Sequence, residues 1–242
     1  MSGGGKMLRL DQLEFCYSGT AAMRMCFDLS VEDGEVLSLI GPSGCGKSTL
    51  LNLIAGFLPA SGGRILLDGM PIQDLPVAQR PVSIVFQQHN LFPHLDLYTN
   101  VALGVEPSLR LQPAQVETVR SALARLGLDG LQRRKPGELS GGQRQRVALA
   151  RVLVRRRKIL LLDEAFAALG PAQRAELIEL VKELVRENAM VALLVSHQPA
   201  DALVASARTA FICDGRVAAL APTAQLLQQT DPPELRDYLG SK

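Results

Sequence analysis

The stretch GPSGCGKST, Gly41–Thr49, decides the fold of this chain. It matches the pattern G-x-x-x-x-G-K-[ST], with the apolar run VLSLI before it and STLLNLIAGF after it. A buried strand leading into the loop and an apolar helix leading out are the context that this phosphate-binding motif requires. Its glycines let successive backbone N–H groups face one anion, and the helix start adds a partial positive charge. The residues predicted to hold a nucleotide here are Gly41, Pro42, Ser43, Gly44, Cys45, Gly46, Lys47, Ser48 and Thr49.

Two of these side chains have specific chemistry, and a later segment complements them. Lys47 is predicted to reach the β- and γ-phosphates, and the Ser48 hydroxyl to coordinate Mg²⁺. The run ILLLDE predicts a buried strand that ends at Asp163, a second Mg²⁺ ligand acting through water. Glu164 follows directly and is placed to polarise an attacking water. Without the phosphate loop, an apolar run ending in DE would indicate only the end of a strand.

The apolar runs of the chain favour an α/β fold. Short runs that fit buried strands alternate with helical patterns such as Pro171–Asn188, which indicates a largely parallel sheet. The period of two over Met23–Val31 predicts a half-buried strand, followed by a turn at Asp33–Gly34 and a further strand over Glu35–Ile40. Together with Leu8–Phe15, these segments predict a small antiparallel sheet near the start.

The domain organisation follows from where this rhythm is interrupted. Residues 88–138 hold helical periodicity and no convincing strand, which predicts a helical lobe inserted into a core made of residues 7–87 and 139–230. Residues 7–230 then form one domain, with a flexible lead over 1–6 and a tail over 231–242.

Composition excludes several functional classes. The chain has 242 residues, 47% of them apolar, and a net charge of +2, so no charge excess points to nucleic acid as a partner. No apolar run approaches the roughly 20 residues that span a bilayer. The four cysteines have no metal-binding spacing and are interpreted as reduced thiols of a cytosolic protein. The basic run Arg155–Lys158 lacks interleaved aromatic residues and is interpreted as a solvated helix end.

A second glycine-rich stretch carries a resemblance to a known family. LSGGQRQRVALAR, Leu139–Arg151, resembles the signature sequence of ATP-binding-cassette ATPases. The order of phosphate loop, Gln87, signature, Asp163–Glu164 and His197 is also similar to that family, and the resemblance covers residues 7–230. It implies a P-loop core of the RecA type with ATP and Mg²⁺ as cofactors.

The resemblance also implies a head-to-tail homodimer. Each ATP would lie between the phosphate loop of one subunit and the signature of the other, so that the second glycine-rich stretch serves the partner's nucleotide. The residues implied in this contact across the interface are Ser140, Gly141, Gly142 and Gln143.

Three further roles come from the resemblance alone. Tyr17 matches the aromatic residue that stacks on adenine, although a lone tyrosine also fits an edge strand. Gln87 matches the glutamine that senses Mg²⁺ and the attacking water, with Gln88 as the alternative register. His197 matches the switch histidine that contacts the γ-phosphate, whereas a lone histidine after a strand is more often structural.

Two positions depart from the family pattern. Ala165 stands where the family has proline, and Gly170 where it has an aspartate that communicates across the dimer interface. Because glycine supplies no carboxylate and adds backbone freedom, we expect weaker coupling between the two sites or slower turnover.

Within the family, a transporter subunit fits best. There is no long heptad insertion, as in repair proteins, and no second cassette, as in translation factors. The resemblance then implies separate integral membrane permease subunits docking near Leu91, Phe92 and Leu95, an external solute-binding protein, and a peripheral location on the cytoplasmic face of the cell membrane. Several segments resemble the ATPase subunit of bacterial thiamine importers. Importers of iron, polyamine or another small nutrient remain alternatives, as does a cassette ATPase without a membrane partner.

Overall fold

The computed structural model describes residues 7–17, 24–86 and 91–240. Its strands are β1 (Met7–Cys16), β2 (Arg24–Glu32), β3 (Val36–Ile40), β4 (Gly62–Leu67), β5 (Met70–Pro71), β6 (Val82–Phe86), β7 (Ile159–Asp163), β8 (Val191–Val195), β9 (Arg208–Cys213) and β10 (Arg216–Pro222). Its helices are α1 (Lys47–Ala55), α2 (Leu97–Ala102), α3 (Pro113–Arg125), the 3₁₀ turn η1 (Pro136–Glu138), α4 (Gly141–Arg155), α5 (Pro171–Glu187), α6 (Pro199–Ala205), α7 (Thr223–Leu226) and α8 (Pro233–Leu239).

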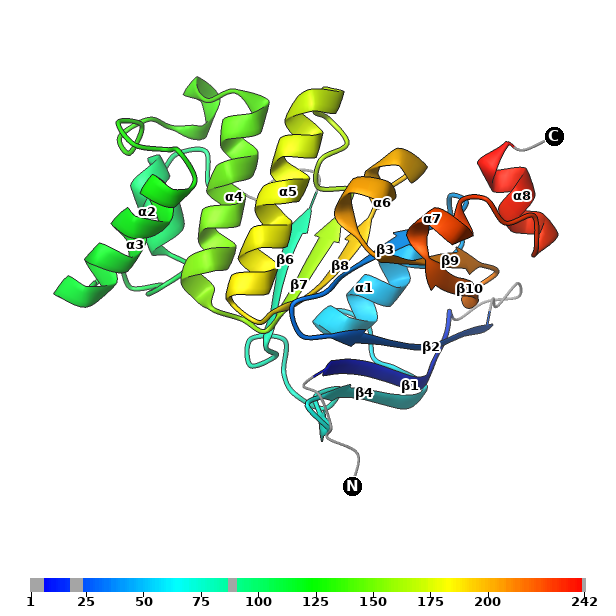
Figure 1. The fold of residues 1–242 in the computed structure, drawn as a ribbon. Helices are drawn as coiled ribbons and strands as arrows, with labels where there is room; N and C mark the ends of the chain where they lie inside the picture. Colours follow the sequence, from blue (N-terminus) through cyan, green and yellow to red (C-terminus); the bar gives the residue numbers. More distant parts are fainter. Residues whose placement is uncertain (1–6, 18–23, 87–90, 241–242) are drawn as a thin grey trace.

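Within these residues the strands form one sheet in the order β5-β4-β1-β2-β10-β9-β3-β8-β7-β6 (Figure 1). The part from β9 to β6 is parallel throughout. β3 and β8 are buried at every position, which explains their nearly continuous apolar sequences. The predicted α/β fold with a largely parallel sheet is confirmed.

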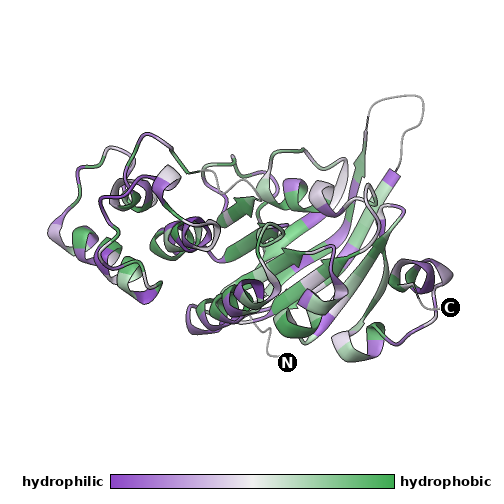
Figure 2. Ribbon diagram, turned by 90° about the horizontal axis from the view of Figure 1, so that it is seen from above, coloured by the Kyte–Doolittle hydropathy of each residue, from purple (hydrophilic) through white to green (hydrophobic). Residues whose placement is uncertain are grey.

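Helices cover both faces of this parallel part. α4 and α5 lie on one face, while α1 lies on the other, between the sheet and the curled strands β1, β2 and β4 (Figure 1). Viewed from above, the strands are mostly apolar and the helices carry their polar residues outward (Figure 2). The carboxyl ends of β3, β7 and β8 therefore open at one edge, where ligands of parallel α/β sheets bind.

The antiparallel part differs in one respect from the prediction. β1 pairs with β2 and β4 as expected, but the prediction was wrong in placing β3 with them, because β3 pairs in parallel with β8 and β9. The turn at Asp33–Gly34 thus leads from one part of the sheet to the other. The two parts meet where β10 pairs with β2 through a single bridge, Arg216 with Cys26. The apolar sequence of β3 does not indicate which strands lie beside it, so it could not distinguish antiparallel pairing with β1 and β2 from parallel pairing with β8 and β9.

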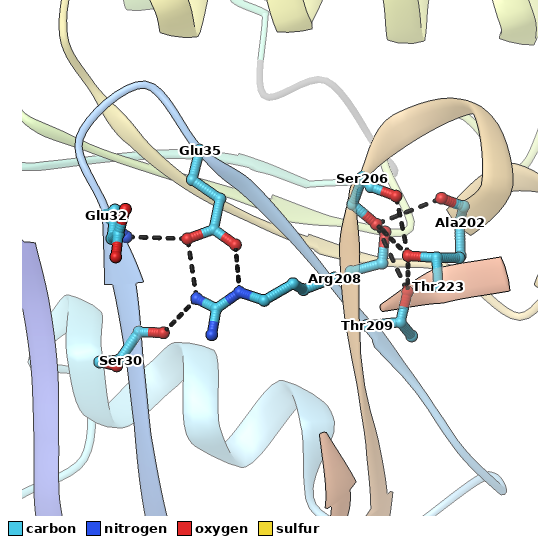
Figure 3. Close-up of polar contacts among 9 residues, drawn as sticks. Ser30, Glu32, Glu35, Ala202, Ser206, Arg208, Thr209 and Thr223 are labelled. Atoms are coloured by element: carbon cyan, nitrogen blue, oxygen red, sulfur yellow. Dashed lines mark hydrogen bonds and ion pairs between the residues drawn. The ribbon is translucent and has the colours of Figure 1, made fainter. Parts of the chain in front are cut away.

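An ion pair and hydrogen bonds stabilise the region where the two parts of the sheet meet. Arg208 at the start of β9 forms a bidentate ion pair with Glu35, with both N–O distances 2.8 Å, and donates to the carbonyl of Ser30 at 2.9 Å (Figure 3). Close by, the buried hydroxyl of Ser206 donates to that of Ser38 at 2.7 Å. Such pairing keeps buried polar groups satisfied.

Residues 91–138 contain α2, α3 and η1, and no strand in the described part. They lie beyond α4, away from the antiparallel strands (Figure 1). The domain boundaries given above stay a prediction. In the tail, α8 packs on the core through the fully buried Leu235. Among the described helices, none is long and apolar enough to cross a membrane.

Candidate functional site

The phosphate loop follows β3 directly and ends where α1 begins. Gly41 and Gly46 have φ values of 146° and 110°, conformations that favour glycine. A Cβ on Gly41 would lie 2.1 Å from the carbonyl oxygen of Ile212, so the neighbouring strand β9 leaves no room for a side chain. The first glycine of the motif is therefore required by the packing of the sheet as well as by the loop.

Lys47 lies across this loop and is almost fully buried. Its ammonium group donates to the carbonyl oxygens of Gly41 and Pro42 at 2.8 and 2.7 Å. These bonds place the charge at the centre of the loop, where the anion of a nucleotide would sit.

Ser48 and Asp163 come together from distant parts of the sequence. The Ser48 hydroxyl donates to a carboxylate oxygen of Asp163 at 3.3 Å. Burial raises the pKa of Asp163, and the neighbouring charge of Glu164 raises it further, while Ser48 and Lys47 act in the opposite direction. Two adjacent oxygen donors beside a phosphate loop fit Mg²⁺, which uses few protein ligands.

Glu164 and His197 form the second polar pair of the site. Nε2 of His197 lies 2.5 Å from a carboxylate oxygen of Glu164. Glu164 has a φ of 50°, a backbone conformation that is uncommon for residues other than glycine. Its N–H donates to the carbonyl of Val195 at 3.2 Å, which helps to hold this conformation. β7 ends at Asp163, opposite Val195 of β8, which explains why Glu164 and His197, 33 positions apart, meet.

The signature segment starts α4. Ser140 is the N-cap, and its hydroxyl accepts from the N–H of Gln143 at 3.2 Å, while the Gln143 side chain accepts from the N–H of Ser140 at 2.9 Å. Gly141 and Gly142 occupy the first turn and are partly exposed. Among the described residues, no hydrogen bond or ion pair joins this segment to the phosphate loop of the same chain. The segment offers amide groups and a helix start outward.

The remaining predicted residues have different outcomes. The hydroxyl of Tyr17 lies 2.9 Å from that of Thr49, so the tyrosine stands beside the start of α1 with 46% of its surface exposed. Gln87, predicted as a Mg²⁺ ligand, and the alternative Gln88 lie outside the described residues. Ala165 is buried, and Gly170 is the N-cap of α5.

Four residues that sequence reasoning did not select surround His197. Arg174 contacts Gln198 and Asp201, and Asp201 accepts a hydrogen bond from Ser196 at 2.6 Å. The available signal was Arg174 itself, since it lies on the buried stripe of α5 that continues with Leu177. A single charge on an apolar helix face indicates a buried partner.

The loop, the acidic strand end and the Glu164–His197 pair together define a P-loop nucleotide-binding protein. Comparison with known proteins narrows this class. Residues 26–167 match the family model described as ABC transporter, and with the relatives below this shows that the chain belongs to the ABC transporter family.

Three curated relatives are similar over nearly the whole chain. The "Thiamine import ATP-binding protein ThiQ" of Brucella abortus is 51% identical, covering 96% of this chain and 95% of the relative. Proteins of the same description from Ruegeria sp. and Shigella boydii are 50% and 48% identical, covering 97% and 91% of this chain and 100% and 94% of the relatives.

A solved structure is similar in fold. It is a dimeric ATP-binding cassette in a post-hydrolysis state, bound to ADP and Pi, with a TM-score of 0.77 and 29% identity. The match covers 89% of this chain and 98% of that chain. The predicted family, an ABC-type ATPase with a P-loop core, is confirmed.

Proposed function

We propose that this chain is the ATP-hydrolysing subunit of a bacterial thiamine importer. The observation that carries the proposal is the identity of about half the residues, over nearly full length, to proteins described as thiamine import ATP-binding proteins. The site supports it, because the groups needed for phosphoryl transfer to water lie together at one edge of the sheet.

In the proposed reaction each polar group has one task. The backbone N–H groups of residues 41–49, Pro42 excepted, and the ammonium of Lys47 bind the phosphates, with Lys47 turning from the two carbonyls toward the anion. Glu164 orients an attacking water, and His197, 2.5 Å away, holds the γ-phosphate. Tyr17 would stack on the adenine.

Ser48 and Asp163 would hold Mg²⁺, together with Gln87, which lies outside the described residues. Their oxygen donors lie 3.3 Å apart, and within the described residues no set of three or more His, Cys, Asp or Glu side chains could hold a metal by itself. This donor set fits a cation that keeps water and substrate phosphates as its other ligands. When bound, Mg²⁺ would neutralise negative charge on the phosphates.

We further propose that two copies close around two ATP molecules. In each site Ser140, Gly141, Gly142 and Gln143 of one copy would meet the nucleotide of the other, an arrangement supported by the outward-facing start of α4 and by the dimeric state of the similar cassette. Closure of the dimer would move the membrane subunits, and hydrolysis of ATP would allow the dimer to open again. A Glu164→Gln variant would bind ATP, dimerise and fail to hydrolyse it.

A groove between β6 and α4 suits the membrane subunit. It has a volume of about 240 Å³ and is lined by Phe57, Ser83, Phe86, Ala148, Arg151 and Val152. Phe92 is 41% exposed, and its ring lies 5.6 Å from the guanidinium of Arg151. We propose that a helix of the permease docks here, near Leu91 and Leu95, on the cytoplasmic face of the membrane, and that a solute-binding protein delivers thiamine from outside.

The test is uptake of labelled thiamine by cells that lack the gene. Complementation with the wild-type gene should restore ATP-driven uptake, and Glu164→Gln should reduce it by about 100-fold or more, because the water is no longer oriented. Equal amounts of both proteins at the membrane provide the control.

Each alternative has its own outcome. Uptake of thiamine that never depends on the gene, with uptake of iron or polyamine that does, would replace the substrate. Failure to co-purify with any membrane-spanning protein would favour a cassette ATPase without a transport role.

A further inference from the structure

Arg174 is a buried charge next to the proposed hydrolysis site. It lies near the start of α5, on the face that continues with Leu177 and Ile178, and its side chain is 7% exposed. A charged group on the buried face of a helix requires partners, because burying an unpaired charge costs free energy.

Its guanidinium joins two segments of the chain. Nη2 donates to the carbonyl of Leu169 at 2.9 Å, in the segment that follows Glu164. Nη1 donates to a carboxylate oxygen of Asp201 at 3.3 Å and also contacts the side-chain oxygen of Gln198. One side chain thus connects the segment after β7 with the segment after β8.

The second connection surrounds His197. The other carboxylate oxygen of Asp201 accepts from the Ser196 hydroxyl at 2.6 Å, and the same hydroxyl accepts from the N–H of Gln198 at 3.0 Å. Both sequence neighbours of His197 are therefore linked to Arg174, directly or through one carboxylate. The imidazole between them meets Glu164 at 2.5 Å.

The pairing of Arg174 is incomplete for a purely stabilising residue. Its Nε is buried and has no hydrogen-bond partner among the described residues. Arg174 also lines a cavity of about 50 Å³ together with Glu164 and His197. Apolar residues of similar volume often stabilise a core as well as a buried ion pair does, so stability alone gives little reason for arginine here.

We infer that Arg174 is a positioning residue for ATP hydrolysis. It holds residues 196–198, the His197 segment, in a fixed position relative to the segment that follows Glu164. The inference rests on the proposed hydrolytic function. Arg174 acts through His197 and Glu164 and does not itself contact the nucleotide. Since geometric errors of about 1 Å at such sites cost about 100-fold in rate, its loss should affect turnover more than binding.

The first variant is Arg174→Met in the full-length chain. We expect kcat for ATP hydrolysis to fall by about 10–100-fold and KM for ATP to change by less than about twofold, because the phosphate loop is untouched. Lys182→Met is the matched control. Lys182 lies on the same helix and also ties it to α6, through the carbonyl of Val204 at 2.8 Å, but it does not contact the His197 segment. Its kcat should stay within about twofold of wild type.

A double variant separates positioning from stability. Arg174→Met leaves the Asp201 carboxylate, whose side chain is only 15% exposed, without its charge partner and should lower Tm, whereas Arg174→Met with Asp201→Asn removes both charges. We expect Tm to recover toward wild type in the double variant while kcat stays at least about 10-fold low, since the link between the two segments is still missing.

Two results would overturn the inference. One is a kcat that recovers together with Tm in the double variant, which would make the role structural. The other is an unchanged kcat in a folded Arg174→Met protein. If wild type itself hydrolyses no ATP, the proposed function fails instead, so the two failures are distinguishable.

Discussion

The phosphate loop and the His197 segment both face the proposed nucleotide, but they are held in different ways. In the loop, Lys47 bonds to the carbonyls of Gly41 and Pro42, and the N–H of Cys45 bonds to the carbonyl of Pro42, all within seven residues. The conformation of His197 depends on contacts with Glu164, 33 residues away, and with Tyr238, 41 residues away, whose hydroxyl donates to its carbonyl at 3.3 Å.

This difference shows where each region is sensitive. Locally built geometry fails when one residue no longer fits the backbone. Geometry built from distant side chains fails gradually, as each contact is removed, and is the more easily adjusted of the two.

The strongest way to break the loop is Gly41→Ala. The new Cβ would overlap the Ile212 carbonyl of β9 at a φ of 146°, so β3 and β9 must separate. We expect the free energy of unfolding to fall by about 3 kcal/mol, which corresponds to a fall in Tm of about 6–12 °C, and we expect ATP binding to be lost. Thermal unfolding with and without ATP measures both.

Gly44→Ala is the control in the same loop. Gly44 also has a positive φ, 78°, but a Cβ there meets nothing within 4 Å. Its cost should be about 1 kcal/mol, or about 2–4 °C. Equal losses in the two variants would contradict the argument that β9 packing fixes the first glycine.

The variant Asp163→Asn tests how much the buried carboxylate of the site destabilises the folded chain. Burial raises the pKa of Asp163 above its ordinary value of 3.8, so the folded chain binds that proton more tightly than the unfolded chain does. Stability therefore falls as pH rises from about 3.8 through the raised pKa. Asp163→Asn removes this cost and should raise Tm by about 1–3 °C at neutral pH without nucleotide, with no gain below pH 3.8.

If Asp163 holds Mg²⁺ as proposed, the same variant should also lose the stabilisation expected from Mg²⁺ and ATP in wild type, because the proposed charged ligand of the cation is gone. Asp129→Asn, at an exposed position, provides the control and should change neither quantity. A lower Tm for Asp163→Asn without nucleotide would show that the carboxylate stabilises the fold.

The contrast between the two regions also explains what the sequence could predict. The phosphate loop and the strand ending at Asp163 are local patterns, and the structure has a strand, a loop and a helix where their motifs require them. The pairing of β3 with β8 and β9, and the contacts of Arg174 with Gln198 and Asp201, depend on segments more than 20 residues apart. Periodicity carries no information on such partners.

Strands β4 and β10 were not predicted for a related reason. Both have mixed burial patterns, and neither sequence alternates cleanly between apolar and polar residues. Their place depends on the strands that they pair with.

The smallest expected effect sharpens the comparison at Gly170. This residue caps α5 with φ −65° and ψ 158°, makes no side-chain cap bond, and has nothing within 4 Å of a built Cβ. Gly170→Asp should therefore fit and cap the helix, raising Tm by about 1 °C. If the carboxylate that the family has here couples the two sites, ATPase rate and cooperativity should also rise, by about twofold.

Gly170→Asn separates these two effects, because asparagine caps a helix as well as aspartate but carries no charge. Both variants should gain the same small stability, and only the aspartate should change the rate and cooperativity. A rate that rises equally in both would assign the effect to a stiffer start of α5, directly after Leu169, whose carbonyl accepts from the buried guanidinium of Arg174. An unchanged rate in both would mean that the two sites of the dimer do not communicate through this position.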